Sequence, residues 1–159
     1  MKGALPGAAP EAVARYAREQ EELFARAERM VQRFGVVQER SRLMLAASAR
    51  APRTDEALQR ELLALRDNMQ AIDIDLNGTK ARSQVLEDRA TPGLRDFLGN
   101  AAEGGSSLTY GPTATHRASR VHAEKLLVDL ERRVNEAYAK ADALEPRLEA
   151  LGAPALKER

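Results

Sequence analysis

The residues from Asp73 onward have the spacing of a calcium-binding loop. Asp73, Asp75, Asn77 and Gly78 fall on the first, third, fifth and sixth positions of the EF-hand pattern. Ca²⁺ needs about six oxygen ligands, and the last is normally a bidentate glutamate at the twelfth position. Here the twelfth residue is Gln84, and the apolar residues between the aspartates continue a helical pattern. The sequence therefore favours the end of a helix at Gly78 over a calcium site between Asp73 and Gln84.

Other residues that could do chemistry are isolated from one another. His116 and His122 are six residues apart, so a helix would not place them on adjacent turns of one face, as a metal pair requires. Acidic residues are abundant, but slender bundles of long helices rarely form a pocket where carboxylates converge. The chain has no cysteine, which excludes disulfides, thiol catalysis and thiolate ligands. We therefore expect no catalytic residue, no metal site and no cofactor, and we do not expect an enzyme.

The charge balance argues against nucleic acid and membrane partners. There are 25 Lys and Arg against 24 Asp and Glu, for a net charge of +1, and the two signs alternate along the chain. This pattern is typical of solvated helix faces and provides no strong field for nucleic acid. An apolar run of about 18 residues, which a membrane span needs, is absent from the sequence. We predict a soluble chain without an export signal, and the sequence leaves its compartment open.

Three long amphipathic helices account for most of the chain. The first is predicted from Pro10 to about Ala49, and the second begins after Thr54, a good N-cap, and ends before Gly78. The third begins at Thr113 or Thr115. The second helix has an apolar seam at Leu58, Leu62, Leu65, Met69, Ile72 and Leu76. The seam of the third helix is the most regular, at Ala123, Leu127, Leu130, Val134, Ala137, Ala141, Leu144, Leu148 and Leu151.

The stretch between the second and third helices has weaker patterns. Residues 79–90 can form a short helix, and an apolar turn follows it. Gly and Ser then predict a mobile loop over 99–112. Leu108 and Tyr110 in this loop, with His116 just after it, are the residues that we expect to contact a partner.

The predicted fold class is all-α, an antiparallel three-helix bundle made of a long helical hairpin, short extra helices and a long C-terminal helix. Residues 1–10 are expected to be flexible, 11–154 to form a single domain, and 155–159 to be a tail. Pro146 predicts a kink or a break in the last helix, and Gly35 is a weak point of the first. A coiled-coil homodimer that buries part of the seams is the alternative arrangement.

Capping and packing residues carry a resemblance to a known family. They are Gly78 and Thr79 after the helix that ends at Leu76, the Thr91-Pro92 step, Gly111-Pro112-Thr113 before the last helix, Pro146, and Leu151-Gly152-Ala153-Pro154. In these features the chain resembles the helical C-terminal tail of bacterial sortilin-like β-propeller proteins, commonly labelled glycosyl hydrolases. The resemblance implies that the helices follow a large exported propeller, which would hold any hydrolase chemistry. The 159 residues contain no propeller, so the resemblance implies an isolated domain or a free-standing relative.

Together these patterns predict a non-catalytic structural and protein-interaction module. The resemblance implies the C-terminal accessory domain of an exported β-propeller protein, whose partner is a propeller domain or a second copy of the chain. The alternative is a free-standing cytoplasmic coiled-coil adaptor or chaperone-like protein that holds partners along its apolar seams.

Overall fold

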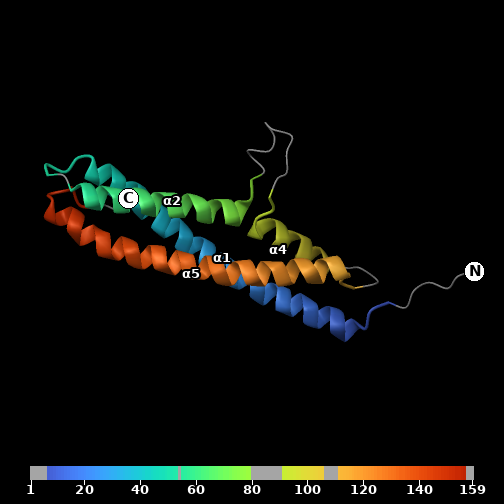
Figure 1. Ribbon diagram of the computed structural model, residues 1–159. Helices are drawn as coiled ribbons and strands as arrows, with labels where there is room; N and C mark the ends of the chain where they lie inside the picture. The colour runs from blue at the N-terminus through green and yellow to red at the C-terminus, as the bar shows by residue number, and fades with distance from the viewer. Residues whose placement is uncertain (1–6, 54, 80–90, 106–110, 157–159) are drawn as a thin grey trace, which may run out of the picture. The chain divides into compact units, whose positions relative to one another are not determined.

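The structure is a computed structural model that describes residues 7–53, 55–79, 91–105 and 111–156. Of these residues, 81% are helical and none lies in a strand. The helices are α1 (Pro10–Ser48), α2 (Glu56–Asn77), α4 (Leu94–Glu103) and α5 (Ala114–Ala150), as Figure 1 shows. The predicted all-α class is confirmed.

The contacts divide the chain into two compact units. Unit 1 consists of Met1–Arg29 and Ile74–Asp129, and unit 2 consists of Met30–Asp73 and Leu130–Arg159. The helices α1, α2 and α5 contribute residues to both units, whereas α4 belongs to unit 1 alone. The single domain predicted over 11–154 stays a prediction.

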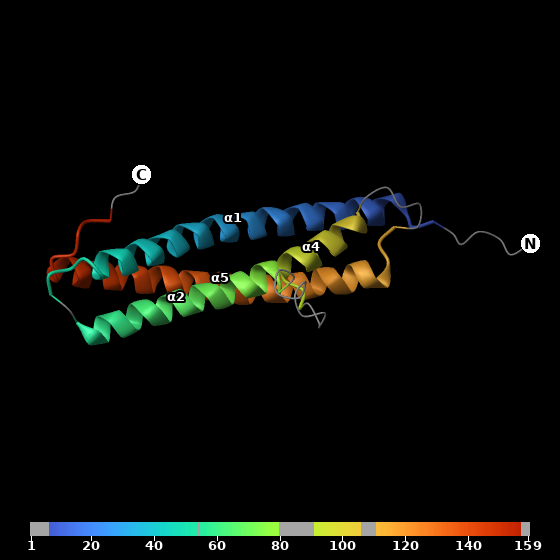
Figure 2. The same ribbon diagram turned by 90° about the horizontal axis from the view of Figure 1, so that it is seen from above.

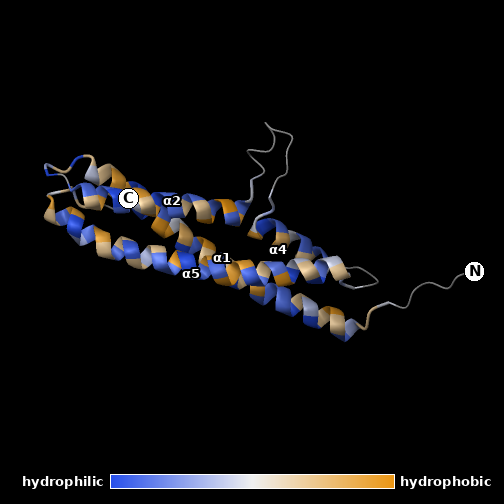
Figure 3. Ribbon diagram, in the orientation of Figure 1, coloured by the Kyte–Doolittle hydropathy of each residue, from blue (hydrophilic) through white to orange (hydrophobic). Residues whose placement is uncertain are grey.

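In unit 2, segments of α1, α2 and α5 lie side by side in both views (Figures 1 and 2). Each helix alternates apolar and polar residues along its length (Figure 3), as amphipathic helices do. The residues of the predicted α2 and α5 seams that belong to this unit are buried, except Leu151, which is half-buried and follows the end of α5. The buried apolar residues of the unit are Met30, Phe34, Val37, Met44, Ala47, Leu58, Leu62, Leu65, Met69, Ile72, Leu130, Val134, Ala137, Ala141, Leu144 and Leu148.

In unit 1, the short helix α4 packs beside α1 and α5. Its residues Leu94, Leu98 and Ala101 are buried. The ring of Phe97 on α4 stacks on that of His122 on α5, with centroids 5.3 Å apart. The helix extends into the range 99–112, for which a loop is predicted, so that prediction is wrong over 99–103. Burial of Ala101 outweighs the low helix propensity of the glycine and asparagine before it.

Helix ends follow local capping. The Asp55 carboxylate caps α2, because its Oδ1 accepts hydrogen bonds from the amides of Ala57 (2.9 Å) and Leu58 (3.1 Å). The end predicted for α2 is confirmed at Gly78, whose φ of 75° is left-handed. A Cβ there would lie 2.7 Å from the carbonyl oxygen of Thr91, so this position requires glycine.

Helix α5 continues through Pro146 to Ala150, so the chain has no helix break at this proline. Pro146 is exposed, and Leu144 and Leu148 on either side of it are buried. The packing of these two leucines therefore holds the helix across the hydrogen bond that proline removes.

Some predictions fall outside the described residues. They are residues 1–6 of the flexible segment predicted over 1–10, the cap at Thr54, residues 80–90 of the short helix predicted over 79–90, residues 106–110 of the loop predicted over 99–112, with Leu108 and Tyr110, and residues 157–159 of the tail predicted over 155–159.

Candidate functional site

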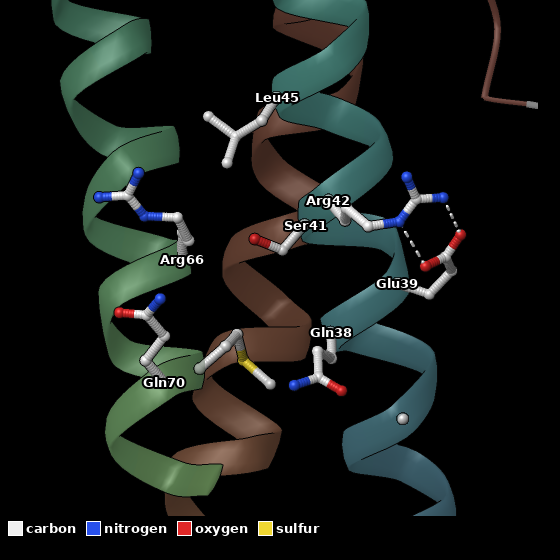
Figure 4. A pocket seen from close by; sticks show the side chains of 9 residues that line it. Gln38, Glu39, Ser41, Arg42, Leu45, Arg66 and Gln70 are labelled. Atoms are coloured by element: carbon white, nitrogen blue, oxygen red, sulfur yellow. Dashed lines mark hydrogen bonds and ion pairs between the residues drawn. The ribbon is translucent and has the colours of Figure 1, made fainter. Parts of the chain in front are cut away.

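A groove lies between α1 and α2 of unit 2, and Figure 4 shows it from close by. Its volume is about 500 Å³. Helix α1 lines it with Gly35, Gln38, Glu39, Ser41, Arg42 and Leu45. Helix α2 lines it with Arg66, Met69 and Gln70. We call this feature the α1–α2 groove.

Two small residues of α1 help to leave the α1–α2 groove open. Ser41 takes a buried position of the α1 seam, between the apolar residues Val37 and Met44. Gly35 is exposed, and a Cβ added to it would meet no atom within 4 Å. Neither residue carries a side chain long enough to reach across to α2. A glycine inside a helix lowers stability by about 1 kcal/mol relative to alanine, and no contact among the described residues requires one here.

The centre of the groove is apolar and amide-lined. In Figure 4, Gln38 on α1 and Gln70 on α2 lie on opposite sides, and Leu45 lies at the level of Arg66. The buried Met69 lies beneath the groove on the α2 side and brings its thioether to the floor. Thioethers adapt to irregular apolar surfaces, and glutamine amides both donate and accept hydrogen bonds. The centre therefore suits a protein surface of mixed polarity.

The charged groups at the rim are paired with neighbours on their own helix. Arg42 donates to Glu39 from Nε (2.8 Å) and from Nη2 (2.6 Å), and its guanidinium is drawn away from α2 in Figure 4. The hydrogen bond from Arg42 holds the pKa of Glu39 below its ordinary value of 4.5. Arg66 donates to Asp67 at 2.7 Å. The rim thus carries both signs of charge in exposed, rearrangeable pairs.

The contact between α1 and α5 in unit 2 is closed by charged and aromatic side chains that bind one another across the two helices. Arg40 of α1 donates to Asp142 at 2.7 Å and to Glu145 at 2.6 Å on α5. The guanidinium carbons of Arg33 and Arg40 lie 4.3 and 5.2 Å from the centroid of the Tyr138 ring. A second hollow of about 470 Å³ adjoins this cluster, but its charged groups already bind one another.

Charged pairs also close the contact between α2 and α5. Glu61 of α2 accepts hydrogen bonds from Lys140 and, at 2.7 Å, from Arg147 of α5. These two bonds lower the pKa of Glu61 from 4.5 to about 2. Charged side chains clamp both of these interfaces, whereas the α1–α2 groove offers room and the amides of Gln38 and Gln70 for a partner.

The predicted contact residue His116 has a structural place in unit 1. Its amide donates to Thr113 Oγ1 at 3.3 Å, and its Nδ1 accepts from the Thr113 amide at 3.2 Å, so the two residues cap α5 reciprocally. Gly104 packs against the His116 side chain, where an added Cβ would lie 2.7 Å from the His116 Cβ and 2.8 Å from Nδ1. Leu108 and Tyr110 lie outside the described residues, so their grouping with His116 stays a prediction.

The calcium pattern falls on regular helix. Asp73 and Asp75 lie inside α2, in helical rather than loop geometry, while Gln84 lies outside the described residues. Over the described ranges, no three His, Cys, Asp or Glu side chains gather as a metal ion would need. Within the same ranges, no helix is both long and apolar enough to cross a bilayer.

A buried polar cluster in unit 1 positions α4. Tyr16 Oη donates to the carbonyl of Ala101 at 2.9 Å, and Gln20 Nε2 donates to that of Leu98 at 3.4 Å. Arg120 of α5 lies over the Tyr16 ring at 5.4 Å and donates to Glu19 at 2.6 Å. Burial raises the pKa of the Tyr16 hydroxyl. The polar residue Gln20 in the apolar seam of the first helix could have indicated this buried cluster. The sequence did not indicate that its partner is α4.

No model of a known protein family matches this chain, and neither the curated proteins nor the solved structures contain a match. The resemblance to sortilin-like propeller tails therefore stays a prediction.

Proposed function

We propose that this chain is a non-catalytic protein-interaction module, folded as an antiparallel three-helix bundle, that binds its partner in the α1–α2 groove. The groove itself is the observation that supports this function. It combines about 500 Å³ of space with apolar, amide and paired charged groups, which is the composition of a protein interface and not of a reaction centre.

Helix geometry indicates the kind of segment that fits. Two neighbouring helices with small residues between them form a trough that runs along their axes, and an amphipathic helix fits such a trough. Gly35 lets the partner backbone approach α1 closely, while the half-buried Leu45 provides an apolar contact. The occupant is therefore a helical protein segment.

The resemblance supplies the context for this module. We propose that the bundle is the C-terminal accessory domain of an exported β-propeller protein, with catalysis, if the protein has any, confined to the propeller. This proposal rests on the capping residues from Gly78 to Pro154 that carry the resemblance. A reading frame that joins a propeller to this chain would support it, and an independent gene for the chain would contradict it.

Photo-crosslinking tests whether protein occupies the groove. A photoreactive amino acid replaces Gln70 in the groove or, as a control, the exposed Asn135 on α5. In cells that carry the native gene, we expect light to attach a protein to the Gln70 position and not to the Asn135 position. Equal yields at both positions, or no product from either, would contradict the proposed function.

A further inference from the structure

We propose that the occupant of the α1–α2 groove is a second copy of this chain, docked groove to groove around a twofold axis near Gly35. This inference rests on the proposed function, since it names the partner of the same site. A twofold interface brings one surface against itself, so the surface must be complementary to its own copy. The groove meets that requirement in its charges, its amides and its shape.

The charges of the groove are self-complementary. Arg42 and Glu39 lie three residues apart on α1 and have opposite signs, and both side chains are more than half exposed. In a twofold pair, each arginine can exchange its own glutamate for that of the other copy without leaving a charge unpaired. The net charge of +1 gives little repulsion between two copies.

The amides of the groove are self-complementary as well. Gln38 and Gln70 lie on opposite walls, and each amide carries donors and an acceptor. A second copy presents the same two amides in reverse order, so donors and acceptors can meet across the interface. An acidic or a basic partner would match the groove less well, because the rim carries both signs.

The shape of the groove favours close approach at Gly35. A Cβ at this position would meet nothing within 4 Å, so the fold of one copy leaves space above the α1 backbone. Two such glycines facing each other allow two α1 helices to cross at short distance. Leu45 of each copy, which is half-buried in one chain, then faces the new interface, with the buried Met69 beneath it.

Gly35→Gln, with Gly99→Gln as the matched control, tests this proposal. Both glycines lie inside helices with open space around them, so glutamine should raise helix propensity at either site and leave the monomer folded. Sedimentation equilibrium of the full chain should show a dimer for the unmodified protein and for Gly99→Gln. A side chain at the crossing point should weaken the Gly35→Gln dimer by about tenfold or more.

A single cysteine gives an independent readout, because the natural chain has none. Under oxidation, Gln38→Cys should form a disulfide-linked dimer much faster than Asn135→Cys. A monomer at all concentrations, or a dimer that Gly35→Gln leaves intact, would overturn the proposal. If the chain is monomeric but Gln70 still crosslinks to another protein, the second copy is wrong and the proposed function stands. If Gln70 crosslinks to no protein, both are wrong.

Discussion

Units 1 and 2 each bury one face of a segment of α1, but the residues on that face differ in chemistry. In unit 2 the buried face of α1 is mainly apolar, through Met30, Phe34 and Val37. Ion pairs at the surface of this unit join α1 to α5 and α2 to α5. In unit 1 the buried face includes Tyr16 and Gln20, which bond to carbonyl groups of α4. Apolar burial supplies most of the stability, whereas buried hydrogen bonds fix where a short helix sits.

The largest expected effect comes from the apolar core of unit 2. Leu62 is 0% exposed and its neighbour Leu63 is 37% exposed. Leu62→Ala should lower the free energy of unfolding by about 2–5 kcal/mol, because it leaves a cavity. Leu63→Ala should change it by about 0.5 kcal/mol or less. Urea denaturation measures both, and similar losses for the two variants would contradict the assigned core.

A smaller effect is expected from the polar cluster of unit 1. Tyr16→Phe removes the hydroxyl that bonds to the Ala101 carbonyl and should cost about 1 kcal/mol in unfolding free energy. Amide hydrogen exchange should also become faster in α4. Tyr138→Phe is the control, because it keeps the ring under Arg33 and Arg40. If Tyr16→Phe left α4 exchange unchanged, the hydroxyl would not be what holds this helix.

Two glycines should respond in opposite directions to alanine. Gly35→Ala should stabilise the monomer by about 0.5–1 kcal/mol, since the position is helical and open. Gly78→Ala should destabilise it by about 1 kcal/mol or more, because φ is 75° and the Thr91 carbonyl blocks the Cβ. Thermal unfolding at low protein concentration, where association contributes little, measures both changes. A loss of stability in Gly35→Ala would show that the glycine serves the monomer fold.

The smallest expected effect is the pH dependence at Glu61. The pKa of this carboxyl is lowered from 4.5 to about 2, so its contribution to stability is complete above pH 4.5 and is lost as the pH falls through about 2. Its exposure to solvent keeps that contribution small. The difference in the midpoint of unfolding between the unmodified chain and Glu61→Gln should become smaller as the pH falls over this range. Glu149→Gln on α5 is the control. A midpoint difference for Glu61→Gln that stays constant down to pH 2 would contradict the assigned ion pairs of Glu61 with Lys140 and Arg147.

The regular seams could be predicted from sequence, because leucine spacing in α2 and α5 determines which face is buried. The end of α2 at Gly78 could also be predicted from local sequence, because the left-handed residue that ends a helix is usually glycine. The extent of α4 could not, because Gly99 and Asn100 favour a loop and the Ala101 carbonyl is bound by Tyr16, far away in the chain. The groove could not be predicted, because Gly35 and Ser41 contribute to it by leaving space, which no sequence pattern marks.

The most direct test of the groove as a binding site is its accessibility in the cell. Gln70→Cys places one thiol in the groove and Asn135→Cys places one on an exposed face of α5. The rate of alkylation is compared between intact cells and dilute purified protein. A partner in the groove predicts that the rate falls in cells at position 70 and not at position 135. Equal rates in the two settings at position 70 would contradict the proposed function.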